Sequence, residues 1–146
     1  MCSVNVLAND GAFYASGNQL IPIVETDISV KKEILTIKRS PGGYLHITVA
    51  YVFDNPTDAK EILVGFEAPS PIGDVNGTPV DGQHPYISNF SVMMNGLPLK
   101  YETALVLDSN YYVNQSVQSK SEDDLIDKWF NVNDPEFYYV YHFTAK

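Results

Sequence analysis

The sequence predicts an all-β domain, a β-sandwich of two mostly antiparallel sheets with one short helix. The first observation is a period-two alternation of apolar and polar residues along Tyr44–Phe53, which Ile62–Ala68 repeats after a turn at 54–58. Such alternation is typical of strands that bury one face. The second is the pair Asn95-Gly96 between two further alternating stretches, a strong hairpin signal. Two sheets with facing apolar sides would form an Ig-like sandwich.

Length and charge limit what this domain can be. With 146 residues, of which 45% are hydrophobic, the chain is long enough for one core and too short for two. The net charge of −9 argues against nucleic acid as a partner, because phosphate binding needs clustered Lys and Arg. No run of about eighteen apolar residues is present, so we expect no membrane span.

We expect residues 1–8 to be the remnant of an export signal or a disordered leader. Residues 9–146 would then form a single domain, truncated at its C-terminus. Val6-Leu7-Ala8 has the residue types that a secretory signal peptidase accepts before its cleavage point. Cys2 is the only cysteine, so no internal disulfide can form. A lipid anchor on Cys2 is the alternative role for this segment.

The first long strand is predicted at Ile28–Arg39, after a short edge strand at 19–24. Its apolar residues change parity, from the even positions of Ile28, Val30 and Ile34 to the odd positions of Leu35 and Ile37. Such a change indicates a β-bulge or a move between sheets. Residues 40–43 contain Pro and two Gly and favour a turn. We therefore expect an antiparallel hairpin with the strand that follows.

The middle of the chain contains a long loop and then a tight hairpin. Residues 69–85 include four Pro and three Gly, and loops of this length in compact domains are often functional. Asn95-Gly96 favours a type I′ turn between alternating residues at 90–94 and 97–107.

The last part of the chain predicts one helix and one central strand. Ser121 precedes three acidic residues, which favours the start of a helix of two or three turns. The final strand, expected within Phe137–Thr144, is aromatic or apolar on both faces. Strands of this kind are usually central or covered.

No arrangement of reactive residues indicates catalysis. The three histidines, His46, His84 and His142, lack the close spacing of a metal-binding pair. The stretch Asp74–Asp81 has alternating oxygen ligands, but Pro79 stands where a calcium loop needs glycine. No Gly-x-Ser-x-Gly motif is present. We expect no catalytic residue, no metal and no cofactor, and we do not expect an enzyme.

Tyrosines in loops are the best candidates for binding. Tyr86, Tyr111 and Tyr112 fall in or beside loops, and His84 lies in the long loop. A tyrosine ring can stack on a sugar or anchor a protein partner while losing little entropy. The alternative is that these rings pack in the core. That second interpretation is preferred for the tyrosines within strands, namely Tyr51, Tyr101, Tyr139 and Tyr141.

Several segments carry a resemblance to a known family. They are Asn9–Pro22, Glu25–Ile28, Lys32–Ile37, Val64–Pro69 and Phe137–Phe143. In these segments the chain resembles an uncharacterised family of secreted bacterial proteins that often carry a C-terminal YARHG domain. The resemblance implies export and further residues beyond Lys146, and it brings no established function. A looser resemblance, through 53–56, 66–69 and 90–96, is to the N-terminal β-sandwich of the vault and inter-α-trypsin inhibitor heavy-chain type.

These observations together predict a secreted or periplasmic module that binds or supports other molecules without catalysis. Its partner would be an unknown protein or glycan of the bacterial cell envelope. The alternatives are a carbohydrate-binding domain or a glycan-processing hydrolase, the latter if a pair of carboxylates, for which residues 122–124 are candidates, met in a cleft.

Overall fold

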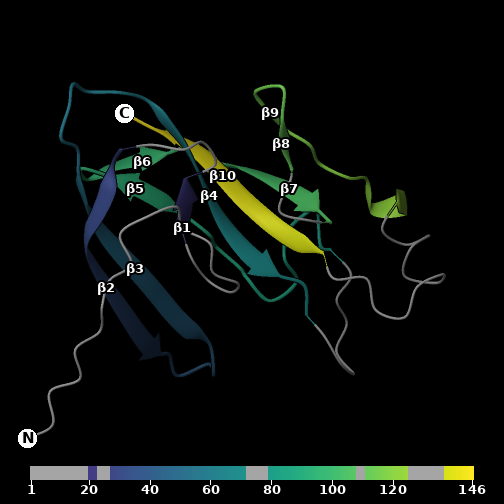
Figure 1. Ribbon diagram of the computed structural model, residues 1–146. Coiled ribbons are helices and arrows are strands. Elements are labelled where there is room, and N and C mark those ends of the chain that lie inside the picture. The colour runs from purple at the N-terminus through teal and green to yellow at the C-terminus, as the bar shows by residue number, and fades with distance from the viewer. Residues whose placement is uncertain (1–19, 23–26, 72–78, 108–110, 125–136) are drawn as a thin grey trace, which may run out of the picture. The chain divides into compact units, whose positions relative to one another are not determined.

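The computed structural model describes residues 20–22, 27–71, 79–107, 111–124 and 137–146 (Figure 1). They form antiparallel strands with very little helix, so the predicted all-β class is confirmed. They divide into two compact units. We call residues 27–60 the hairpin unit, and residues 20–22 together with the described residues from 61 onward the sheet unit. Each unit is described by itself, and the packing of two sheets as a sandwich stays a prediction.

In the hairpin unit, β2 (Ser29–Arg39) pairs with β3 (Leu45–Asp54) in antiparallel fashion (Figure 1). The register shifts between Val30 and Lys32, which leaves Lys31 as the extra residue of a β-bulge. A bulge shifts the side-chain alternation by one residue and therefore moves Val30 onto the face that carries Leu35. The predicted hairpin is confirmed, and of the two expected causes of the parity change, a bulge and a move between sheets, the structure has the bulge.

Both ends of the hairpin are closed by hydrogen bonds. At the turn, the Ser40 N–H donates to the Tyr44 carbonyl at 2.9 Å, and Gly43 adopts a φ of 86°, which favours glycine. At the open end, the Lys60 ammonium donates to the Asp27 carboxylate. This hydrogen bond is the main reason that the pKa of Asp27 is lowered.

One face of the hairpin is apolar, and much of it is exposed. Leu35 is 57% exposed and Ile47 is 61% exposed, and the rings of Tyr51 and Phe53 stack with centroids 5.9 Å apart. The cross-strand register places on this face Val30, Leu35, Ile37, Leu45, Ile47, Val49, Tyr51 and Phe53.

The sheet unit is built on a four-stranded antiparallel sheet with the order β1-β4-β10-β7. The strands are β1 (Leu20–Pro22), β4 (Ile62–Pro69), β7 (Glu102–Val106) and β10 (Tyr138–Ala145). The final strand is central, as predicted, because β10 pairs with β4 on one side and β7 on the other. Tyr139, Val140 and Tyr141 are each 0% exposed, so β10 is covered on both faces.

Two small hairpins accompany this sheet. The pair β5 (Val92–Met94) and β6 (Leu97–Leu99) is joined by Asn95-Gly96, whose φ angles of 51° and 80° fit the predicted type I′ turn. The pair β8 (Tyr112–Val113) and β9 (Ser116–Val117) was not predicted. Its turn residues, Asn114 and Gln115, also have positive φ angles.

The alternating stretch 97–107 does not form one strand. It is divided between β6, which pairs with β5, and β7, which pairs with β10. The division falls at Tyr101, whose ring packs edge-on against Phe90 with centroids 5.0 Å apart. Phe90 in turn lies 4.2 Å from the ring of Tyr141, so Tyr101 contributes to the aromatic core at the point where the chain changes partner strand.

The predicted helix begins where expected. Residues 122–124 are helical, and the rest of the predicted helix lies outside the described residues. The Asp124 N–H donates to the Ser121 hydroxyl at 3.2 Å, and the Ser121 N–H donates back to the Asp124 carboxylate. This reciprocal pair is a capping arrangement in which each partner satisfies a backbone donor of the first turn.

Candidate functional site

The described part of the long loop forms a compact structure, residues 80–87, which we call the His84 turn. Val80 and Gln83 exchange two backbone hydrogen bonds of 3.0 Å. The residues between them, Asp81 and Gly82, have φ angles of 53° and 70°, as a type I′ turn requires. A second turn follows, in which the Ile87 N–H donates to the His84 carbonyl at 3.1 Å.

Both ring nitrogens of His84 have hydrogen-bond partners. Nε2 lies 3.1 Å from the carbonyl oxygen of Pro69, at the end of β4, and Nδ1 accepts the Tyr86 N–H at 3.1 Å. A carbonyl can only accept and a backbone N–H can only donate. These partners therefore assign to His84 the neutral tautomer with its hydrogen on Nε2.

The aromatic surroundings of His84 favour this neutral form. Its ring packs edge-on against Tyr139 with centroids 4.9 Å apart. Burial lowers the pKa of His84, and the hydrogen bond to the Pro69 carbonyl opposes that shift. The ring is accordingly uncharged at neutral pH.

Further contacts attach the His84 turn to three strands. The His84 N–H donates to the Tyr141 hydroxyl of β10 at 3.2 Å, and Gln83 accepts a hydrogen bond from the Thr103 hydroxyl of β7 at 3.1 Å. With the Pro69 carbonyl of β4, the turn has a polar contact to each of these strands. Ile87 adds apolar packing against the core.

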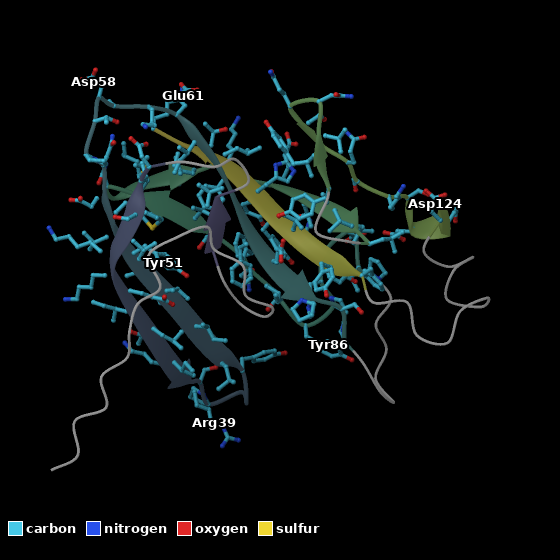
Figure 2. All side chains as sticks on the ribbon, viewed as in Figure 1. Arg39, Tyr51, Asp58, Glu61, Tyr86 and Asp124 are labelled. Atoms are coloured by element: carbon cyan, nitrogen blue, oxygen red, sulfur yellow. The ribbon has the colours of Figure 1, made fainter. Side chains whose placement is uncertain are left out.

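Tyr86 is the exposed aromatic side chain of this turn, in which Val80 and Asp81 are also exposed. It is 61% exposed, and Figure 2 labels it beyond the C-terminal end of β4. Its ring lies edge-on to that of His84, with centroids 6.2 Å apart. The structure therefore brings together two of the residues predicted for binding, His84 and Tyr86.

The other two predicted residues lie elsewhere. Tyr111 is only 7% exposed and packs with Val140, while Tyr112 is half-buried against the same cluster. Val140 alternates along β10 with Tyr139, the residue that His84 contacts, so Tyr111 and the His84 turn cover opposite faces of the sheet. Tyr111 thus has the burial of a core residue rather than of a contact residue.

Among the tyrosines assigned to packing, Tyr139 and Tyr141 are 0% exposed. Burial raises the pKa of both phenols. Tyr101 and Tyr51 are half-buried. Tyr101, Tyr139 and Tyr141, the tyrosines of the sheet unit that were assigned to packing, therefore pack as expected.

The remaining histidines lie on other elements. His46 is exposed on the hairpin, and His142 on β10 lies 4.0 Å from the Glu102 carboxylate. Burial lowers the pKa of His142, and Glu102 opposes that shift. Within the described ranges, no three His, Cys, Asp or Glu side chains are grouped so as to hold a metal ion. Most of the calcium-like stretch, through residue 78, lies outside those ranges.

Sequence reasoning missed the groups that hold the His84 turn in place. The Pro69 carbonyl, Gln83 and Thr103 give no local signal because they meet through contacts distant in sequence. Asp81-Gly82 is a favourable pair for a type I′ turn and could have been found.

The fold and this turn define an all-β protein with a loop fastened over one face of an antiparallel sheet. Comparison with protein-family models, curated proteins and solved structures finds no match to the chain. In the part of the chain that the structure describes, there is no helix with the length and apolar character needed to cross a membrane.

Proposed function

We propose that this chain is a non-catalytic binding or structural module of a secreted or periplasmic bacterial envelope protein, and that it contacts its ligand through the His84 turn. The observation that carries the proposal is the exposed Tyr86 ring on a turn fastened to three strands. An aromatic side chain on a preorganised backbone loses little entropy on binding. The ligand would be a protein or glycan of the envelope.

The proposed location is supported by sequence features rather than by the fold. These are the Val6-Leu7-Ala8 segment before Asn9 and the resemblance to secreted bacterial proteins. Fractionation of the native host would test it. Recovery of the protein only with cytosolic markers would contradict the proposed location.

The binding role is tested with Tyr86→Ala and a matched control. Tyr44 provides the control because it is also an exposed tyrosine, 71% exposed, and lies on the hairpin turn. A photocrosslinker placed at position 86 or at position 44 would be activated in an envelope extract. We expect a defined product from position 86 whose yield falls when untagged wild type competes and does not fall when untagged Tyr86→Ala competes. Equal products from both positions, or no product from position 86, would contradict the proposal.

A carbohydrate-binding domain is the second candidate, favoured by the exposure of the Tyr86 ring, which is able to stack on a sugar face. A glycan array that includes peptidoglycan fragments would separate it from a protein-binding module. Binding lost in Tyr86→Ala and retained in Tyr44→Ala would identify a glycan as the ligand. Release of reducing sugar from any of these glycans would instead support the hydrolase alternative.

A further inference from the structure

We propose that His84 is a pH-sensitive latch, in which protonation of the ring at Nδ1 frees the Tyr86 end of the turn while Nε2 stays bound to the Pro69 carbonyl. This inference is independent of the proposed function, because it concerns only hydrogen bonds within the sheet unit. It rests on the different chemistry of the two contacts that the imidazole makes.

The two contacts respond to a proton in opposite ways. Nδ1 accepts the Tyr86 N–H at 3.1 Å, and it can do so only while it has no hydrogen of its own. After protonation, two N–H groups would face each other, so this hydrogen bond must break. Nε2 already donates to the Pro69 carbonyl at 3.1 Å, and a positive charge on the ring strengthens that hydrogen bond. The ring therefore stays attached to β4 while the turn opens at Tyr86.

The groups around the ring offer little support to an imidazolium. The titratable side chains that face it are phenols, namely Tyr86 of the same turn and Tyr139 of β10, while the Tyr141 hydroxyl binds the His84 backbone. Burial keeps Tyr139 and Tyr141 protonated and neutral. The negative charge of Glu122 also raises the pKa of Tyr139. The Pro69 carbonyl is the group that favours the charged form of the His84 ring.

The direction of the response follows from this environment. Because burial lowers the pKa of His84 below the ordinary 6.5, the latch is closed at neutral pH and opens only below pH 6.5. The Ile87 N–H donates to the His84 carbonyl and not to the ring, so this hydrogen bond is not broken by protonation. The movement is therefore confined to Pro85 and Tyr86, and it changes the position of the exposed Tyr86 ring.

NMR of the full chain labelled with ¹⁵N tests the latch directly. The imidazole nitrogens of His84 and the amides of Tyr86, Ile87 and Gln83 would be followed from neutral to acidic pH. We expect the Tyr86 amide to shift with the same midpoint as His84, and its protection factor against hydrogen exchange to fall by about five- to tenfold. The Ile87 and Gln83 amides should keep their protection factors.

Two variants complete the test. In His84→Asn, the amide oxygen can accept the Tyr86 N–H without titrating, so the transition should disappear, whereas His142→Asn should leave it unchanged. The proposal is overturned if the Tyr86 amide does not respond while His84 titrates, or if the transition persists in His84→Asn. Should that variant fail to fold, the wild-type measurement decides alone, because both midpoints come from the same sample.

Discussion

The two units use the same alternating pattern with opposite results. In the sheet unit, Val140 of β10 is 0% exposed, whereas Ile47 of β3 in the hairpin unit is 61% exposed. Both strands follow a period of two and both are paired along their length. The alternation of a sequence therefore predicts a strand and its apolar face, but it does not predict how deeply that face is buried.

The difference follows from the number of neighbours. Within the sheet unit, β10 has a strand on each side, aromatic packing on one face and the β8–β9 cluster on the other. Within the hairpin unit, β3 pairs with β2 alone. Two-stranded hairpins are marginally stable by themselves, so we expect the sheet unit to dominate the measured stability.

The largest expected effect is the loss of a central ring. Tyr141→Ala removes contacts with Phe66, Phe90 and Tyr101, and also the hydroxyl that accepts the His84 N–H. We expect it to lower the free energy of unfolding by about 3–5 kcal/mol, measured by denaturant titration. Tyr86→Ala, which truncates an exposed ring, should cost less than about 1 kcal/mol. Similar losses in the two variants would mean that exposure does not separate core from surface in the sheet unit.

A matched pair of glycines compares the two units directly. Gly96 and Gly43 both close hairpin turns, with φ angles of 80° and 86°. Alanine at either position should cost about 1 kcal/mol, because its side chain disfavours positive φ. For Gly96→Ala we expect the free energy of unfolding of the sheet unit to decrease.

For Gly43→Ala we expect the loss only in the hairpin unit, seen as faster hydrogen exchange of the β2 and β3 amides with β10 unchanged. If Gly43→Ala destabilised β10 as much as Gly96→Ala does, the two units would unfold as one.

A smaller effect is expected on the exposed face of the hairpin. Ile47→Asp replaces an exposed apolar side chain, and Thr48→Asp is its control on the other face of the same strand. Both should change the free energy of unfolding by about 0.5 kcal/mol or less. A loss of several kcal/mol in Ile47→Asp alone would show that this face is covered in solution.

The smallest effect expected is a pH dependence that belongs to the sheet unit. His84 and His142 both have lowered pKa values in the folded state. Between those values and 6.5 the unfolded chain binds more protons than the folded chain. The free energy of unfolding is therefore highest above about pH 6.5 and decreases as the pH falls below it. Denaturant titrations at a series of pH values below 6.5 should show this decrease. The double variant that combines His84→Asn with His142→Asn should not show it. An increase in the free energy of unfolding on acidification would contradict this prediction.

Much of the fold could be predicted because its signals are local. The parity change between Ile34 and Leu35 indicated a bulge or a move between sheets, and the structure has a bulge at Lys31. Asn95-Gly96 indicated a turn, and the two apolar faces at 137–144 indicated a central strand. The division at Tyr101 could not be predicted, because the alternation continues across it and says nothing about the partner strand. The turn at 114–115 has no glycine, so its hairpin gave no signal.

The candidate site was predictable only in part. A long loop with His84 and Tyr86 was visible in the sequence, but its attachment through Gln83 depends on a partner distant along the chain. Tyr111 is buried, which fits the alternative that its ring packs in the core; a position beside a loop does not reveal the side chain's burial.

The central place of β10 also has a consequence for synthesis. Its residues leave the ribosome after those of β4 and β7, the two strands that it joins. Until then, the backbone groups of β4 and β7 that β10 will bind have no partner, and Ala68 and Leu105 lack the ring of Tyr139 beside them. Unpaired edges of this kind bind other incomplete chains. The nascent protein is therefore most vulnerable to aggregation just before this strand emerges.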